Sequence, residues 1–209
     1  MQLTNVSREQ LKRLPIYLDY LKSLPEDSEI ISATAIAKAL GLGDVQVRKD
    51  LAKVSCAGRR GTGRSREELL QDIEGYLDLA TKTGAVVVGA GKLGCALLDY
   101  TGFEKQGLNI LAGFDIAPGT GRTESGKPVY PMNRLAAFCR HYDVLTGIIA
   151  VPADSAQQAC DSLVACGVRA IWNFAPAYLK VPDHVALQSE NPAVSLTALR
   201  MQIQPAKED

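Results

Sequence analysis

Hydrophobic residues recur at three- and four-residue steps over residues 8–24, a spacing that predicts an amphipathic helix. Pro15 falls inside this segment. It is expected to interrupt the helix and to begin a second one, because proline is tolerated in a first helical turn. Helical spacing returns over residues 67–81. The first eighty residues are therefore predicted to be mainly helical.

Between these segments, two short helices joined by a glycine-containing turn are predicted. Ser32 is placed to cap a helix over Ala33–Leu40, and Gly41 is placed to end it. Asp44 is placed to cap the next helix, over Val45–Val54. This arrangement predicts a helix-turn-helix.

The stretch after the helix-turn-helix, SCAGRRGTGRS, is rich in glycine and arginine. This composition suits a hairpin wing better than a helix. Residues 1–82 are therefore predicted to form a winged-helix domain.

From Ala85 the pattern changes to short apolar runs without clean alternation, as expected of strands buried on both faces. The runs are AVVVG, NILAGF, LTGIIAV and VRAIWNF. Helical segments are predicted between them, over Lys92–Thr101, Met132–Tyr142 and Ser155–Cys166. Alternating strands and helices indicate a doubly wound parallel sheet, so an α/β Rossmann domain is predicted over 83–191. A last helix is predicted over Ala193–Ile203, within a C-terminal segment 192–209.

A glycine-rich loop follows the first predicted strand, with Gly89, Gly91 and Gly94 in GxGxxG spacing. Such a loop allows a tight turn, close approach of a pyrophosphate and helix–strand packing. Asp115 stands at the end of the second predicted strand, where a carboxylate accepts ribose hydroxyls and repels a 2′-phosphate. The motif predicts NAD(H) rather than NADP(H). Arg122, farther along a glycine-rich loop, is interpreted mainly as a solvated arginine, and the alternative is that it weakens this preference. The alternatives are a structural glycine turn or another nucleotide-bearing ligand.

The chain has 23 basic and 23 acidic side chains and no formal net charge, which by itself argues against nucleic acid. Residues 48–66, however, contain a single acid, Asp50. A local patch of this kind binds phosphates even in a neutral chain, although a solvated helix face is the alternative. The basic residues of the segment are Arg48, Lys49, Lys53, Arg59, Arg60, Arg64 and Arg66.

The sequence also limits the cellular compartment and the metal chemistry that are expected of the protein. No apolar run approaches 18 residues and the N-terminus lacks a signal-peptide pattern, so a cytoplasmic protein without a membrane segment is expected. Five cysteines without a CxxC pair, and two isolated histidines, predict neither a disulfide framework nor a metal site. Cys95 follows Gly94 at a helix N-terminus, which lowers a thiol pKa. A packing role for this cysteine is the main interpretation.

The order of winged helix, Rossmann domain and C-terminal helix resembles the Rex family of redox-sensing transcriptional repressors. The resemblance covers most of the chain, and it implies a homodimer that binds double-stranded operator DNA. Two recognition helices predict a pseudo-palindromic operator. NADH binding would release the DNA, with NAD+ a weaker competitor, and the helix of 192–209 would swap onto the partner subunit. The matching stretches are RLPIYLDYL, VQVRKDLAKV, VVVGAGKLGCALLDY, GFDI, AVPADSAQQACDSLV and NFAPAYLKVPDHV.

Site residues follow from the same resemblance. DNA contact carries over to Arg48, Lys49 and Lys53 on the recognition helix and to Arg60 and Gly61 in the wing. Gln46 on the same helix and Arg59 in the same hairpin are also predicted to contact DNA. The cofactor would contact the loop residues Gly89, Ala90, Gly91, Lys92, Leu93 and Gly94, then Asp115 and Ile116, then Ala150, Val151 and Pro152, together with Tyr100 and Asn191.

The chain departs from the family pattern in two places. Tyr100 matches a tyrosine that pairs in relatives with an aspartate near the start of the C-terminal helix, and here that position is Asn191, followed by Pro192. The wing residues 55–58 lack the phenylalanines of relatives. These departures leave the fold expectation unchanged and concern the strength of NADH discrimination and the choice of operator.

The leading hypothesis is therefore an NADH-responsive repressor that catalyses nothing. One alternative is a small NAD-dependent oxidoreductase with an accessory N-terminal domain. Hydride transfer needs a positioned acid–base residue, however, and His141 has no partner in the pattern. A second alternative is a DNA-binding dimer with a weakened cofactor response, which Asn191 and Pro192 motivate.

Overall fold

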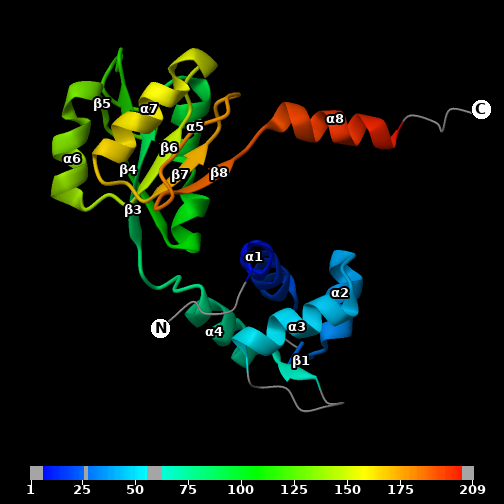
Figure 1. The fold of residues 1–209 in the computed structure, drawn as a ribbon. Coiled ribbons are helices and arrows are strands. Elements are labelled where there is room, and N and C mark those ends of the chain that lie inside the picture. Colours follow the sequence, from blue (N-terminus) through cyan, green and yellow to red (C-terminus); the bar gives the residue numbers. More distant parts are fainter. Residues whose placement is uncertain (1–6, 26–27, 56–62, 204–209) are drawn as a thin grey trace, which may run out of the picture. The chain divides into compact units, whose positions relative to one another are not determined.

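The computed structural model describes residues 7–25, 28–55 and 63–203 of the chain (Figure 1). Two compact units divide the chain, one ending at Thr81 and the other beginning at Lys82. The first is helical and the second is built on a parallel sheet.

The N-terminal unit packs its helices around one apolar core, as their leucine spacing predicts. Ser32 accepts a hydrogen bond from the Ala35 N–H and caps α2, and Gly41 ends that helix in the left-handed conformation (φ 65°), so both predicted boundaries are confirmed. The elements of this unit are α1 (Arg8–Ser23), β1 (Ile30–Ile31), α2 (Ala33–Leu40), α3 (Asp44–Val54), β2 (Arg64–Ser65) and α4 (Arg66–Tyr76). Its largest fully buried side chains are Leu14, Tyr17, Leu18, Leu21, Ile36, Leu51, Leu69 and Ile73.

Helix α1 is continuous through Pro15, so the predicted interruption is wrong. A proline inside a helix removes one backbone hydrogen bond and crowds the preceding turn. Buried residues on both sides of it, among them Leu14 and Leu18, belong to the same core. Packing of this apolar face outweighs the local cost of Pro15 and keeps the helix whole.

Replacing Pro15 with alanine is expected to stabilise the N-terminal unit by about 1–3 kcal/mol, because the substitution restores a helical N–H and removes the ring clash. Thermal unfolding followed by circular dichroism checks this, with hydrogen exchange of α1 amides as the local readout. An unchanged or lower melting temperature would show instead that packing of the half-buried ring offsets the helix strain.

The structure also differs from the sequence predictions in three smaller respects. Gly43 precedes α3, and Asp44 lies in the first helical turn without capping it. Helix α4 ends at Tyr76, before the predicted residue 81, and Asp78 takes a positive φ of 51°. Strand β2 pairs antiparallel with β1, a strand that the apolar pattern did not reveal. Most of the predicted wing lies outside the described residues.

The C-terminal unit contains six parallel strands in the order β5-β4-β3-β6-β7-β8. Its first strand, β3, lies inside the sheet, and the chain builds outward first to one side and then to the other. The prediction of a doubly wound α/β fold is confirmed. The strands are β3 (Thr83–Val88), β4 (Leu108–Asp115), β5 (Val129–Pro131), β6 (Thr146–Ile149), β7 (Ala170–Asn173) and β8 (Ala186–Ser189).

Each face of this sheet has its own apolar core, and alternate residues of β3 serve each. Val86 and Val88 join a core with residues of α6 and α7, whereas Ala85 and Val87 join one with residues of α5. This burial on both faces is why the strand lacks polar alternation. The helices of the unit are α5 (Lys92–Asp99), η1 (Thr101–Gln106), η2 (Met132–Arg134), α6 (Leu135–Tyr142), α7 (Ala153–Ala165) and α8 (Pro192–Gln202).

Candidate cofactor cavity and nucleic-acid interface

The glycine loop between β3 and α5 is tightly packed, and two of its glycines have no room for a side chain. Gly89 has φ +98°, and a Cβ there would lie 2.5 Å from the Ala150 carbonyl oxygen. A Cβ on Gly94 would lie 1.7 Å from the Gly89 carbonyl oxygen. Gly91, the residue before α5, instead has nothing within 4 Å of a Cβ position. Open space thus lies before a helix N-terminus, where backbone N–H groups and the helix dipole favour a phosphate.

Asp115 joins the end of β4 to the glycine loop. Its Oδ2 accepts a hydrogen bond from the Ala90 N–H at 2.6 Å, and its Oδ1 accepts one from the Ala117 N–H at 2.8 Å. These two bonds hold the carboxylate in one orientation beside the loop. A carboxylate has further lone pairs, so it retains capacity to accept from ribose hydroxyls.

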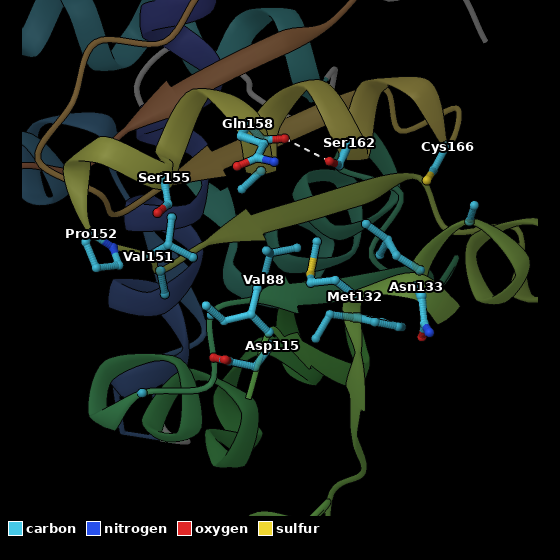
Figure 2. Close-up of a pocket in the computed structure, with 18 of the residues that line it drawn as sticks. Val88, Asp115, Met132, Asn133, Val151, Pro152, Ser155, Gln158, Ser162 and Cys166 are labelled. Carbon is cyan, nitrogen blue, oxygen red and sulfur yellow. Dashed lines mark hydrogen bonds between the residues drawn. The ribbon is translucent and has the colours of Figure 1, made fainter. Parts of the chain in front are cut away.

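A cavity of about 840 Å³ opens at the carboxyl ends of β3, β4 and β6, the place where ligands bind in open α/β sheets. Figure 2 shows Ser155, Gln158 and Ser162 following one another along α7, with Cys166 just after the helix, across the cavity from Val88. Its size lies in the range of small-molecule and cofactor sites. The full lining is Val88, Gly89, Gly91, Phe114, Asp115, Ile116, Met132, Asn133, Leu135, Ala136, Ala150, Val151, Pro152, Ser155, Gln158, Ala159, Ser162, Ala165 and Cys166.

The cavity fits an adenine dinucleotide in three respects. It offers an open approach to the α5 N-terminus for a pyrophosphate, a fixed carboxylate for a ribose and an apolar wall for planar rings. Among the described residues that line it, Asp115 and Cys166 are the only ones with ionisable side chains. No histidine, lysine or tyrosine lines it, so the described lining offers none of these three as an acid–base group for hydride transfer.

Seven of the predicted cofactor residues line this cavity: Gly89, Gly91, Asp115, Ile116, Ala150, Val151 and Pro152. Of the others in the loop, Ala90 orients Asp115 and Gly94 packs against the loop. Lys92 and Leu93 are exposed on the first turn of α5. These assignments to the cofactor stay predictions.

Tyr100 and Asn191 lie outside the cavity lining. Tyr100 is 59% exposed, and its ring packs edge-on against Phe103, which packs in turn against Trp172. The Asn191 side chain accepts hydrogen bonds from Ala193 and Val194 N–H groups and so caps α8. The interaction between Tyr100 and residue 191 stays a prediction.

The sequence reasoning missed the contribution of α6 and α7 to the cavity. Met132 and Asn133 of η2 and Leu135 and Ala136 of α6 form one part of the wall. The α7 residues recur at helical steps on one face, and this spacing was the available signal. They are Ser155, Gln158, Ala159, Ser162 and Ala165.

Cys95 does not have an activated thiol. Burial is the largest cause that raises its pKa above the usual value, and the nearby carboxylates Asp99, Asp115 and Glu124 raise it further. These effects outweigh the helix N-terminus, which alone would lower the pKa. The thiol donates to the Ala90 carbonyl oxygen at 3.2 Å, so Cys95 supports the loop.

In the N-terminal unit, α3 exposes one face. Val47, Asp50 and Leu51 are buried, while Gln46, Arg48, Lys49 and Lys53 are exposed, so the predicted DNA-contacting residues share the outer face of the helix. Val45, 63% exposed in the first turn, belongs to the same face and was not predicted. An exposed apolar side chain beside such residues suits contact with a thymine methyl group.

Arg48 is held at the start of α3 by a small polar group. Its Nη2 lies 2.7 Å from Asp44 Oδ2 and donates to Thr34 Oγ1 at 3.3 Å. Thr34 in turn donates to Asp44 Oδ1 at 2.8 Å. The guanidinium is therefore oriented by α2 and α3 together, although it remains exposed.

Two basic residues at the end of segment 48–66, Arg64 and Arg66, donate to backbone carbonyl oxygens within the N-terminal unit. Arg64 donates to the Ser55 carbonyl oxygen at 3.0 Å. Arg66 donates to the carbonyl oxygens of Leu21 and Leu24, at 2.8 and 3.2 Å, where α1 ends. The predicted DNA residues Arg59, Arg60 and Gly61 lie outside the described residues.

The described part of the chain has neither a cluster of metal-ligand side chains nor a helix that spans a membrane. Residues 7–25, 28–55 and 63–203 contain no group of three or more His, Cys, Asp or Glu side chains placed to hold a metal ion. No helix in those ranges is long and apolar enough to cross a bilayer.

The two units match different family models. The model described as "CoA binding domain" matches residues 80–177. The model described as "Putative DNA-binding protein N-terminus" matches residues 5–52.

Similarity to known proteins extends over nearly the whole chain. A "Redox-sensing transcriptional repressor Rex" of Porphyromonas gingivalis is 37% identical over 198 residues, which cover 94% of this chain and 91% of that protein. The protein of the same name from Streptomyces coelicolor is 39% identical over 189 residues, 90% of this chain and 73% of that protein.

Solved structures give the same result. The crystal structure of RSP in complex with β-NAD+ and operator DNA is similar with a TM-score of 0.88 at 35% identity, covering 96% of this chain and 93% of that chain. The structure of RSP with β-NADH has a TM-score of 0.84 at 35% identity, covering 96% of this chain and 95% of that chain.

Proposed function

The chain belongs to the Rex family of redox-sensing transcriptional repressors, and we propose that it binds operator DNA as a homodimer and releases the DNA when NADH binds. The observation that carries the proposal is the presence, in one chain, of the cavity beside Asp115 and the exposed polar face of α3. RSP, a relative of the same architecture, has been solved in complex with NAD+ and operator DNA and in complex with NADH. The family consists of repressors, which sets aside the oxidoreductase alternative.

In this proposal the cofactor is a regulatory ligand. The pyrophosphate lies before Gly91 at the α5 N-terminus, and Asp115 accepts hydrogen bonds from the adenosine ribose. Arg122 is engaged with its own loop, where it donates to the Gly126 carbonyl oxygen at 2.8 Å, which supports NAD(H) over NADP(H). NADH acts by binding the DNA-free arrangement of the dimer more tightly than the DNA-bound one.

Helix α8 supports the homodimer. All its side chains from Val194 to Met201 are exposed, including Leu196 and Leu199, which are 66% and 57% exposed. Apolar residues in this number on an unpacked helix indicate a partner surface. We assign α8 to exchange between the two subunits of the dimer, with residues 192–209 as the swapped segment.

The DNA target follows from the dimer. Two α3 helices related by a twofold axis fit half-sites in consecutive major grooves, about 34–36 Å apart, so the operator is pseudo-palindromic. Gln46, Arg48, Lys49 and Lys53 contact it, with Arg59, Arg60 and Gly61 of the wing. The protein acts in the cytoplasm, where it meets both DNA and the NADH pool.

The test is a gel-shift titration of the operator complex with NADH and, separately, with NAD+. NADH is expected to release the DNA at a lower concentration than NAD+. The variant Asp115→Ala is expected to bind the operator but to need at least tenfold more NADH, because it lacks the ribose acceptor. Equal release by both nucleotides, or by neither, would disprove the redox-sensing function.

Substituting Asn191 with aspartate is expected to strengthen the response to NADH. Aspartate caps α8 as well as asparagine does, and its carboxylate accepts a stronger hydrogen bond from the Tyr100 hydroxyl. The NADH concentration for half-release is expected to fall about three- to tenfold. If the substitution has no effect, or if the gain persists in an Asn191→Asp variant that also carries Tyr100→Phe, the predicted pairing is wrong.

A further inference from the structure

A buried carboxylate connects the recognition helix to α1. Asp50, on the inner face of α3 and 3% exposed, accepts four hydrogen bonds from three side chains of α1. They come from Gln10 Nε2 at 2.7 Å, Arg13 Nε at 2.8 Å, Arg13 Nη2 at 3.1 Å and Tyr17 Oη at 2.8 Å. We refer to Gln10, Arg13, Tyr17 and Asp50 as the α1–α3 polar cluster.

The charge states in this cluster are fixed. Burial raises the pKa of Asp50, but the hydrogen bonds from Arg13, Gln10 and Tyr17 outweigh it and keep that pKa below its usual value. Burial and the neighbouring carboxylate raise the pKa of Tyr17 to about 12. Asp50 is therefore an anion and Tyr17 a neutral donor at physiological pH. An anion bonded to donors on one helix fixes the rotation of α3 against α1.

Arg13 also reaches the outer face of α3. In the amide orientation that satisfies both partners, Gln46 Oε1 accepts a hydrogen bond from Arg13 Nη1 at 3.0 Å and lies 3.2 Å from Arg13 Nε, whose single N–H is directed to Asp50 Oδ2. The guanidinium therefore bridges buried Asp50 and exposed Gln46. With its oxygen bonded to Arg13, Gln46 has its two amide N–H donors for a partner.

We propose that Arg13, held by Asp50, is a positioning residue that fixes Gln46 as a hydrogen-bond donor toward an acceptor on the operator. This inference rests on the proposed DNA-binding function and extends it to one side chain. Arginine suits this role because its planar fork makes parallel hydrogen bonds in a fixed geometry, which lysine does not reproduce. Purine N7, guanine O6, thymine O4 and phosphate oxygens are the acceptors of this class in DNA.

The experiment is a double-mutant cycle on operator affinity in the full-length protein, with Arg13→Lys, Gln46→Ala and the combination of both. Arg13→Lys keeps the positive charge beside Asp50 but removes the bridge to Gln46. Each single variant is expected to weaken operator binding about tenfold, and the double variant no further, because both remove the same contact. Lys12→Arg is the matched control, one position away on α1, in an exposed pair with Glu9.

A third variant identifies which end of the amide faces DNA. Gln46→Glu keeps an oxygen for Arg13 and has no N–H to donate, so it is expected to lose at least as much affinity as Gln46→Ala. Operators with single 7-deazapurines or methylphosphonates then locate the acceptor. One such substitution is expected to weaken binding by the wild type and to have no effect on Gln46→Ala.

Additive effects of Arg13→Lys and Gln46→Ala would overturn the inference, as would full operator affinity in Gln46→Glu. NADH affinity and melting temperature are measured alongside, and both are expected to match the wild type in every Gln46 variant. If the wild type itself does not bind the operator, the proposed function fails. If it binds and the cycle is additive, only the role of Arg13 fails.

Discussion

Replacing Gly94 with alanine is expected to destabilise the C-terminal unit by more than about 3 kcal/mol and to abolish NADH binding. The added Cβ would lie 1.7 Å from the Gly89 carbonyl oxygen. Because this oxygen belongs to the backbone, the clash can be relieved only if the loop itself moves. Thermal unfolding and equilibrium titration with NADH measure the two effects. A Gly94→Ala variant with wild-type stability would show that the loop accommodates a side chain.

Gly91→Ala is the matched variant in the same loop. Its Cβ meets nothing within 4 Å and its φ is −72°, so the fold is expected to be unaffected. The methyl group would occupy space that a pyrophosphate needs, and NADH affinity is expected to fall at least tenfold. Comparing Gly94→Ala with Gly91→Ala thus separates the effect of loop packing on stability from the effect of steric access on NADH affinity.

The second large effect is expected at Asp50. Asp50→Asn leaves the partly buried Arg13 guanidinium without its counter-ion and presents an amide to donors, which is expected to cost the N-terminal unit about 3–5 kcal/mol at pH 7. Hydrogen exchange of α1 and α3 amides reports on this unit separately. Glu67→Gln, on the exposed surface of α4, is the control and is expected to change little.

The α1–α3 polar cluster also makes the free energy of unfolding depend on pH. The pKa of Asp50 in the folded protein lies below the ordinary value of an aspartate. The stability that this carboxylate contributes is therefore complete above that ordinary value and is lost as pH falls through the folded pKa. The stability difference between wild type and Asp50→Asn is therefore expected to narrow below about pH 4. A difference that stays constant to pH 2 would show that Asp50 does not titrate with unfolding.

Elements with strong local signals were predictable from the sequence. Strands β3 and β4 are apolar because both faces are covered, and α2 has a side-chain cap and a terminal glycine at its ends. Strands β5 and β8 were missed because they are short and partly exposed, so burial leaves little trace in their composition. Pro15 misled the prediction because the packing of α1 is a tertiary effect that local propensity does not contain.

The candidate site was predictable where a motif carries backbone geometry, as at Gly89, Gly94 and Asp115. The α7 side of the cavity was not, since small and polar residues on a helix face also suit a solvated surface. The count of charges in residues 48–66 subtracted the negative charge of Asp50 from the positive charge of the segment. The structure buries it against Arg13, so Asp50 subtracts little from the positive surface of α3.

The ring contacts around Tyr100 allow the intrinsic tryptophan fluorescence of the protein to report on cofactor binding. The chain has one tryptophan, Trp172, whose ring packs between Phe103 and Phe174, and Phe103 also contacts Tyr100. All indole emission therefore originates in the unit that contains the cavity, next to the tyrosine expected to respond to cofactor. Reduced nicotinamide absorbs where indole emits and the oxidised form does not, so NADH is expected to quench Trp172 by energy transfer and NAD+ is not. The intensity of Trp172 emission in a single unlabelled sample thus distinguishes NADH from NAD+.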